Sequence, residues 1–359
     1  MINSSFWMTR VKDISAYGGD CISEYSVMKA CQSIPLVNQV YFNNYQLKLS
    51  KEKAYYKNID EIRVAYRDID SEVDVIHCRG IDPFEVIRKE TDKPITFFGG
   101  ITEKEPSKAG KKVDRDRMMR ADAVDVFSPS WKDWIVKDYK VPKDRVHVIP
   151  QAVDHNVFKP LDAQAIRDRY DCDVLLGYVG STQETYLRVE MNALMKRLIA
   201  HNKSVMLVIM TYDLQHNKFM MLDREVLNHV MVHSVDHDEM PLYYNAFDIT
   251  LCLGSAPYAG NMKELECQAC GSPTVAFDMP NRRHRFGDDY PYLSKMKKFK
   301  GLRMLDKSYD EDDLVDKITY LMDNIGDRKK IGRKMVEHSK KFSYKAVGKE
   351  IMNMYRGML

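Results

Sequence analysis

Short apolar and β-branched runs alternate along the chain with segments whose apolar residues recur every three or four positions. The first pattern predicts strands, and the second predicts helices with one buried face. In the first half, the predicted strands are residues 39–42, 74–78, 94–98, 123–127 and 145–149, and the predicted helices are residues 22–31, 83–90 and 130–139. Because strands that alternate with helices form parallel sheets, the sequence predicts an α/β protein.

A second alternating series follows a break in this pattern. Residues 150–160 begin and end with proline and follow neither period, so they predict a linker. The later predicted strands are residues 174–179, 204–210, 230–233, 248–253 and 273–277, and the later predicted helices include residues 312–323 and 327–341. A last helix is predicted after Ser343, a good N-cap residue. We therefore expect two sheet domains, residues 1–155 and 156–341, and a closing helix in residues 342–359.

The composition suits a two-domain globular protein. The 359 residues exceed the size at which one core usually stops growing, and 44% of them are hydrophobic. The longest apolar runs, such as residues 205–210, are far shorter than the roughly 20 residues of a membrane helix. Residues 1–10 lack the regions of an export signal, and seven cysteines suit reduced thiols, so we expect a cytoplasmic protein. The net charge of +3 does not by itself indicate nucleic-acid binding.

The segment 255–276 carries the strongest chemical signal. A strand runs into a turn of small residues, then a helix, a glycine and another strand. The helix is expected to begin near Gly260, which places the free backbone amides of Asn261 and Met262 at the carboxyl edge of the sheet. That geometry binds phosphate. Glu266 lies about one turn further on and can reach the hydroxyls of a ribose, although a glutamate exposed on a helix is also commonplace.

Five segments in this order resemble the retaining family-four glycosyltransferases of the GT-B fold. The family's signature is Glu-x7-Glu followed by Ala-x-Ala-x-Gly-x-Pro-Val, and residues 266–273 match its second half. The other four resemble its interdomain segment, the first turn of its donor domain, a helix before a strand and its closing helix, at residues 148–160, 177–181, 240–248 and 342–355. The resemblance implies two Rossmann-like domains with mainly parallel sheets facing a cleft. Residues 1–155 would hold the acceptor, residues 156–341 would bind the donor, and residues 342–359 would cross back to the first domain.

The resemblance also implies an activity. A hexosyl or pentosyl group would pass from a UDP-sugar or another nucleotide-sugar to a hydroxyl of a polar acceptor such as a glycan, with retention of configuration. The nucleotide-sugar is a substrate, so no cofactor is expected. Enzymes of this kind need no metal, and neither the Cys267–Cys270 pair nor the Asp-x-Asp segments at 68–70 and 171–173 have the context of a metal site.

The donor site departs from the family at several positions. Tyr258 stands where the family has its first glutamate, which touches the donor sugar, so the sugar is left open. Ser181, after Gly180, stands where the family has arginine, and the lysine of the phosphate clamp has no match in register. Arg188 is the nearest cation, either as a partner of the diphosphate or as a solvated helix residue.

The first domain supplies further candidates. Gly19 lies in a glycine pair that resembles the family's glycine-rich loop, where the backbone approaches the donor phosphates or the acceptor. His77 and Arg79 end a predicted strand and share one of its faces, so both are expected to point toward the cleft. Arg79 would stabilise charge there. His77 is an acid–base candidate, with a buried and satisfied histidine as the alternative reading.

Two basic segments are candidates for binding the acceptor or an anion. Residues 102–117 predict a polar, basic loop that includes Lys111 and Lys112 and suits a polar or anionic acceptor. The stretch with Arg282, Arg283 and Arg285 could bind phosphate.

With the lysines at 295–300, the second segment could instead contact a nucleic-acid backbone, which would indicate an enzyme that glycosylates a base in DNA. An ordinary solvated surface is the alternative reading. A hypothesis of another class is a noncatalytic scaffold that binds nucleotide-sugars, motivated by the missing clamp residues. Nothing in the sequence indicates the oligomeric state.

Overall fold

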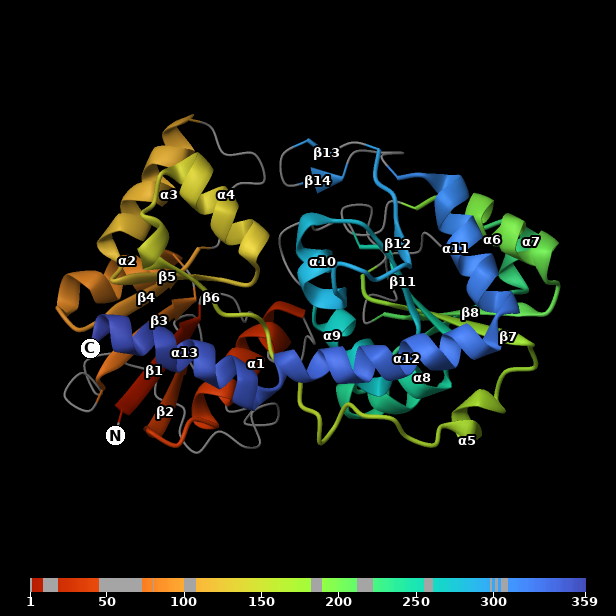
Figure 1. Ribbon diagram of the computed structural model, residues 1–359, viewed down its shortest axis with the longest axis horizontal. Coiled ribbons are helices and arrows are strands. Elements are labelled where there is room, and N and C mark those ends of the chain that lie inside the picture. The colour runs from red at the N-terminus through yellow and green to blue at the C-terminus, as the bar shows by residue number, and fades with distance from the viewer. Residues whose placement is uncertain are drawn as a thin grey trace. The chain divides into compact units, whose positions relative to one another are not determined.

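In a computed structural model the chain forms two compact α/β units (Figure 1). The structure describes residues 2–8, 19–44, 73–79, 81–99, 108–181, 189–211, 222–254, 261–297, 299–300, 303–304 and 309–359. Unit 1 consists of Met1–Ala152 and Phe342–Leu359, and unit 2 consists of Val153–Lys341. The division after residue 152 lies close to the boundary expected after residue 155, and the closing segment belongs to unit 1.

Unit 1 contains a six-stranded sheet in the order β2-β1-β3-β4-β5-β6, with parallel pairing throughout. Its strands are β1 (Ile2–Met8), β2 (Val37–Asn44), β3 (Val75–Arg79), β4 (Ile95–Phe98), β5 (Ala123–Val126) and β6 (Val146–Val148). Its α-helices are α1 (Gly19–Gln32), α2 (Ile81–Glu90), α3 (Lys108–Arg120), α4 (Pro129–Tyr139) and α13 (Tyr344–Met358). Figure 1 shows the sheet between α2, α3 and α4 on one side and α1 and α13 on the other.

Strand β1 occupies an inner position of this sheet but was not predicted. It pairs with β2 on one side and β3 on the other. Ser4 and Phe6 on one face of β1 are both buried. A serine in the buried series interrupts the apolar alternation on which strand prediction depends, so the sequence signal is weak.

Helix α13 completes the core of unit 1. The Ser343 hydroxyl accepts a hydrogen bond from the Ala346 amide and caps the start of the helix, as the sequence predicts. Near the other end, the buried Tyr355 hydroxyl hydrogen-bonds to Ser4 at 2.9 Å and to Cys31 at 3.3 Å. The Tyr355 hydroxyl therefore joins α13 to both β1 and α1, and Figure 1 shows α13 lying beside α1.

Unit 2 contains a second six-stranded parallel sheet, in the order β12-β11-β10-β7-β8-β9. Its strands are β7 (Val174–Val179), β8 (Val205–Met210), β9 (Val230–His233), β10 (Ile249–Cys252), β11 (Thr274–Phe277) and β12 (Leu293–Ser294). A short antiparallel pair, β13 (Phe299–Lys300) and β14 (Arg303–Met304), is separate from it. The run Val-Leu-Leu-Gly-Tyr-Val of β7 is apolar on both faces because helices cover both sides of a parallel sheet.

The helices of unit 2 form two groups. They are α5 (Gln164–Arg167), α6 (Met191–His201), α7 (Arg224–Leu227), α8 (Met240–Ala246), α9 (Met262–Cys270), α10 (Pro280–Phe286), α11 (Glu311–Asp323) and α12 (Ile325–Ser339). α6 packs on α7 and α11, whereas α9 packs on α8 and α12 (Figure 1).

The contact between α9 and α12 depends on two glycines. Gly271 ends α9 with φ +75°, a left-handed conformation that favours glycine. Its carbonyl oxygen lies so close to Gly332 of α12 that a Cβ on Gly332 would overlap it. α12 thus approaches the end of α9 backbone to backbone.

The segment expected as a basic loop at residues 102–117 is helical from Lys108, where α3 begins. α3 is anchored by ion pairs rather than by an apolar stripe: Arg117 and Arg120 both bond to Glu85 of α2. The expectation of a loop was therefore wrong for residues 108–117, and residues 101–107 lie outside the described part of the chain. Within the described residues, no helix combines the length and apolar character needed to cross a bilayer.

Candidate functional site

The carboxyl edge of the unit 2 sheet brings together those described residues of the expected donor site that belong to unit 2. Because all the strands run parallel, the residues directly after β7 and the start of α9 lie at this edge. Gly180 and Ser181 follow β7, and Asn261 is the N-cap of α9, directly before Met262. Tyr258, Gly260 and Arg188 lie outside the described residues. Gly19, the first residue of α1, belongs to unit 1.

The start of α9 has the properties expected of an anion site. The Asn261 side chain makes no capping bond to the helix amides and instead donates to the Glu264 carboxylate at 3.3 Å. The first-turn amides are therefore not used by their own N-cap side chain. The helix runs for nine residues, so these amides carry the partial positive charge of its N-terminus.

Glu266 is buried, so it is not a glutamate exposed to solvent on a helix surface, the alternative that the sequence left open. Its side chain is 5% exposed. One carboxylate oxygen accepts from His237 Nε2 at 2.9 Å, and the other accepts from the Tyr244 hydroxyl at 2.9 Å. Each oxygen has a second lone pair, so the carboxylate can still accept hydrogen bonds from a ligand.

His237 is a functional candidate that the sequence did not reveal. Burial by itself would lower the pKa of His237, but the Glu266 carboxylate outweighs burial, and the pKa is raised above its ordinary value. The ring therefore tends toward the protonated, cationic form. It lies in a short 3-10 turn (His237–Glu239) after β9, with its side chain 24% exposed.

A second missed residue is Lys263, in the first turn of α9. Its amine donates a hydrogen bond to the carbonyl of Val179, the last residue of β7. It also lies 4.8 Å from the centroid of the Tyr178 ring. Gly180 has φ +133°, and a Cβ built on it would lie 2.8 Å from the lysine amine. The lysine thus fills the space that a side chain at position 180 would need.

The basic stretch at residues 282–285 is not the surface patch that the sequence suggested. It lies in α10, and the side chains of Arg282 and Arg285 are 0% and 1% exposed. Arg282 Nε donates to Glu264 Oε1 at 2.9 Å, and Arg285 Nη1 donates to the Asn261 carbonyl at 3.0 Å. Arg283 alone of the three arginines is exposed, and it pairs with Asp278.

These arginines hold the carboxyl edge together. Arg282 also donates to the carbonyls of Phe277, at the end of β11, and Gly254, after β10, both at 3.1 Å. Its guanidinium therefore joins two strand ends to α9. Because Arg282 and Arg285 are buried, neither can contact a nucleic-acid backbone directly.

In unit 1, His77 is a satisfied core histidine and not a cleft residue. It is 1% exposed and stacks on Phe6, with ring centroids 4.2 Å apart. Nε2 bonds to the Tyr355 hydroxyl at 2.6 Å, and Nδ1 lies 3.1 Å from the Thr96 hydroxyl. Both ring nitrogens are engaged, so the structure favours the alternative reading of a buried, satisfied histidine, and an acid–base role for His77 stays a prediction.

Arg79 is also enclosed. Its guanidinium pairs with the buried Asp125 and lies over the rings of Phe98 and Phe127, at 4.9 and 5.8 Å. Asp125 already compensates its charge. The expected role of Arg79 in stabilising charge stays a prediction.

The burial of His77 predicts a pH effect on stability. Burial, with a smaller contribution from Arg79, lowers the pKa of His77 well below 6.5. Below about pH 6.5 the unfolded chain binds a proton at this residue that the folded chain does not, so the free energy of unfolding falls as the pH falls. Compared with wild type, His77→Gln should show a shallower loss between pH 6.5 and 5, by up to about 1.4 kcal/mol per pH unit. Urea unfolding of both proteins at several pH values measures this, and parallel curves would contradict it.

Lys111 and Lys112 remain candidates for the acceptor. Both lie on α3, where Lys111 is 3.7 Å from Asp138 and its amine lies 5.9 Å from the centre of the Tyr139 ring. Lys112 is exposed. Their role stays a prediction.

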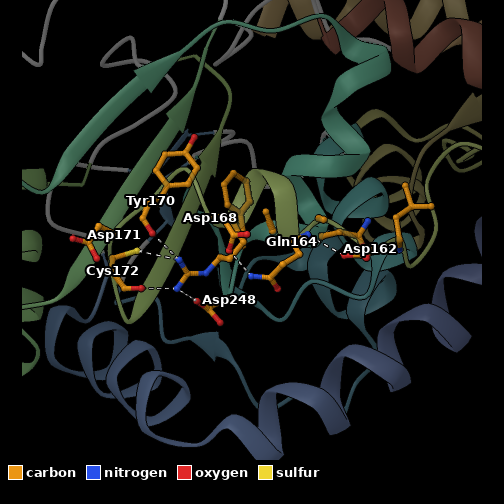
Figure 2. A pocket seen from close by; sticks show the side chains of 13 residues that line it. Asp162, Gln164, Asp168, Tyr170, Asp171, Cys172 and Asp248 are labelled. Atoms are coloured by element: carbon orange, nitrogen blue, oxygen red, sulfur yellow. Dashed lines mark hydrogen bonds and ion pairs between the residues drawn. The ribbon is translucent and has the colours of Figure 1, made fainter.

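A large cavity of unit 2, about 850 Å³, lies at the opposite edge of the sheet. Residues 170–172 precede β7 and Asp248 precedes β10, so the cavity opens at the amino ends of the strands. Figure 2 shows Asp168, Tyr170, Cys172 and Asp248 around it. Asp248 accepts from the Leu175 amide at 2.9 Å and pairs with Arg328 at 3.1 Å, which accounts for its charge. This cavity is distinct from the carboxyl edge where the donor residues lie.

No cluster of three or more histidine, cysteine, aspartate or glutamate side chains suited to a metal ion occurs within the described residues. Cys267 and Cys270 are buried in α9 and free, and Cys267 lies 3.3 Å from the Thr274 hydroxyl. Metal independence stays a prediction.

Comparison with known proteins gives the fold. No family model matches the chain, and no curated protein sequence matches it. Solved structures match over nearly the whole length. A glycosyltransferase from Rickettsia africae ESF-5 has a TM-score of 0.73 at 16% identity, with 99% of this chain and 98% of that chain covered.

Two further structures agree. Anabaena HepE, solved with UDP and glucose, has a TM-score of 0.76 at 12% identity over 99% of this chain and all of its own. Sucrose-phosphate synthase from Thermosynechococcus elongatus has a TM-score of 0.72 at 14% identity over 98% of each chain. The prediction of an α/β protein with the GT-B fold is thereby confirmed.

Proposed function

We propose that the chain is a glycosyltransferase that transfers a sugar from a nucleotide-sugar to a hydroxyl of a polar acceptor. The observation that carries this proposal is the carboxyl edge of unit 2, where the start of α9, the buried Glu266 and three cationic side chains lie together in a GT-B fold. Retention of configuration and independence of metal are part of the proposal and rest on the sequence resemblance.

UDP-sugars are the first donors to test, because HepE was solved in complex with UDP-glucose. In the proposed complex the first-turn amides of α9 bind the diphosphate, and Glu266 accepts hydrogen bonds from the ribose hydroxyls. His237 holds one oxygen of Glu266, so it orients the carboxylate. Sugar transfer develops negative charge on the departing diphosphate, and preorganised donors and cations stabilise that charge.

The two alternatives have different support. A DNA-modifying enzyme loses much of its motivation, because Arg282 and Arg285 are buried. The hypothesis of a noncatalytic scaffold came from the absence of the family's arginine and lysine that bind the diphosphate. The carboxyl edge of the unit 2 sheet nevertheless contains other cationic side chains, so an enzyme is better supported.

A thermal screen tests the proposal. UDP, GDP, ADP, CDP and dTDP are added separately to the pure protein, and unfolding is followed by differential scanning fluorimetry. A nucleotide at about 100 times its Kd stabilises the folded state by about 2.7 kcal/mol. That corresponds to roughly 5–11 °C, at about 2–4 °C per kcal/mol for a domain of this size. One nucleotide should give such a shift, and no shift with any of them would reject the proposal.

Glu266→Gln should weaken binding of the identified nucleotide roughly 10- to 100-fold, the loss expected for hydrogen bonds to a charged group. Glu337→Gln, at an exposed position of α12, is the matched control and should bind normally. Release of the nucleotide from a sugar donor by wild type separates an enzyme from a scaffold, since a scaffold would bind without turnover.

A further inference from the structure

The first turn of α9 is surrounded by an excess of positive charge. Lys263, Arg282 and Arg285 lie there, and Glu264 is the carboxylate that contacts the two arginines within the described residues. Glu264 is 0% exposed, and its two oxygens lie 2.9 Å from Arg282 and 3.8 Å from Arg285. Among the described residues, three cations therefore lie around one anion, and Arg282, Arg285 and Glu264 have little water to screen them, whereas Lys263 is half-buried.

Lys263 is the member of this group without a carboxylate partner among the described residues. Its amine bonds to a neutral carbonyl, that of Val179. Burial lowers the pKa of Lys263, so the charged form is held at a cost. A lysine that merely supported the fold would be more stable with a carboxylate beside it, or as an apolar residue of similar size.

The position of the amine is also specific. It lies at the turn that follows β7, where Gly180 leaves room, and it comes from the same helical turn whose amides face the carboxyl edge. A diphosphate on those amides would bring its negative oxygens beside the amine. The family has its diphosphate-binding arginine directly after the strand that corresponds to β7, where this chain has Ser181. Lys263 reaches the same turn from α9.

We propose that Lys263 is the cation that binds the donor diphosphate and stabilises it as it leaves, in place of the missing clamp residues. Arg282 and Arg285 act as positioning residues, because they fix Glu264 and the N-cap carbonyl and so hold the first turn of α9. This inference rests on the proposed function, since it assigns a residue to the same donor site.

The test compares a nucleoside with its diphosphate, using the base identified by the thermal screen and isothermal titration calorimetry. Lys263→Met should weaken binding of the diphosphate about tenfold or more and leave binding of the nucleoside unchanged, because the nucleoside has no phosphate. Lys263→Arg should restore most of the loss. Lys203→Met, at an exposed lysine before β8, is the control and should behave as wild type.

Several results would overturn the inference. Equal losses for nucleoside and diphosphate would indicate a merely structural lysine, and an unchanged diphosphate affinity would remove it from the site. The titrations are run in EDTA, and loss of wild-type diphosphate binding there would assign the charge neutralisation to a metal instead. If wild type binds no nucleotide at all, the proposed function fails first.

Stability gives an independent readout. Lys263 is half-buried and has no carboxylate partner among the described residues, so replacing it should leave Tm unchanged or raise it. A Tm lowered in both Lys263→Met and Lys263→Gln would indicate a structural role and contradict the inference.

Discussion

Replacing Arg282 with methionine should lower the free energy of unfolding of unit 2 by about 3–5 kcal/mol. The change leaves Glu264 as a buried carboxylate whose closest cation is gone, and Arg285 at 3.8 Å replaces it poorly. Arg282 also holds the end of strand β11 through the Phe277 carbonyl, which loses this donor in the variant. At about 2–4 °C per kcal/mol, Tm should fall by roughly 6–20 °C in a thermal scan.

Two variants make this prediction specific. Arg283→Met changes the next residue of α10, whose ion pair with Asp278 is exposed, so its effect should stay below about 1 kcal/mol. Combining Arg282→Met with Glu264→Gln removes both charges of this ion pair, leaves an amide oxygen beside the buried Arg285, and should recover part of the lost stability. A double variant as unstable as the single one would show that the arginine acts through packing and not through its charge.

Replacing Gly332 with alanine should destabilise unit 2 by about 1–3 kcal/mol and weaken nucleotide binding as well. The added Cβ overlaps the Gly271 carbonyl, which belongs to the backbone and cannot swing aside. α12 and α9 must then move apart. Because α9 carries the proposed diphosphate site at its other end, the same shift should raise the Kd of the nucleotide in calorimetric titration.

Gly326→Ala is the matched control, since this glycine lies in the same helix and nothing lies within 4 Å of a Cβ built on it. It should stabilise the protein by about 0.4–1 kcal/mol, because alanine loses less conformational freedom on folding. Equal effects at positions 326 and 332 would contradict the role given to the close approach of the two helices.

The fold was predictable because parallel strands buried on both faces are nearly continuous apolar runs. The buried strand β7 was predicted with the bounds that the structure has, and so was the edge strand β9, whose run Val-Met-Val is apolar although it is less buried. β1 was missed because serine and asparagine occupy positions where an apolar residue would have marked the strand. Tertiary pairing with β2 and β3 on both sides fixes it, and a single sequence does not contain that information.

The site was predictable where the motif is local and unpredictable where it depends on distant partners. The helix start at Asn261 and the position of Glu266 follow from consecutive residues. The burial of Arg282 depends on Glu264, 18 positions earlier in the chain, and a run of basic residues looks the same whether its partner is water or a carboxylate. The sequence left the two readings of His77 open for the same reason, since its partner Tyr355 is 278 positions away.

Unit 1 is discontinuous, and this affects the order in which the protein can fold during synthesis. Unit 2 is a single stretch, Val153–Lys341, so all its strands and helices have been translated before the ribosome reaches α13. Domains tend to fold as units while the chain emerges. Until Tyr355 is added, Ser4, Cys31 and His77 lack the hydroxyl that joins them, so the half translated first is the half completed last.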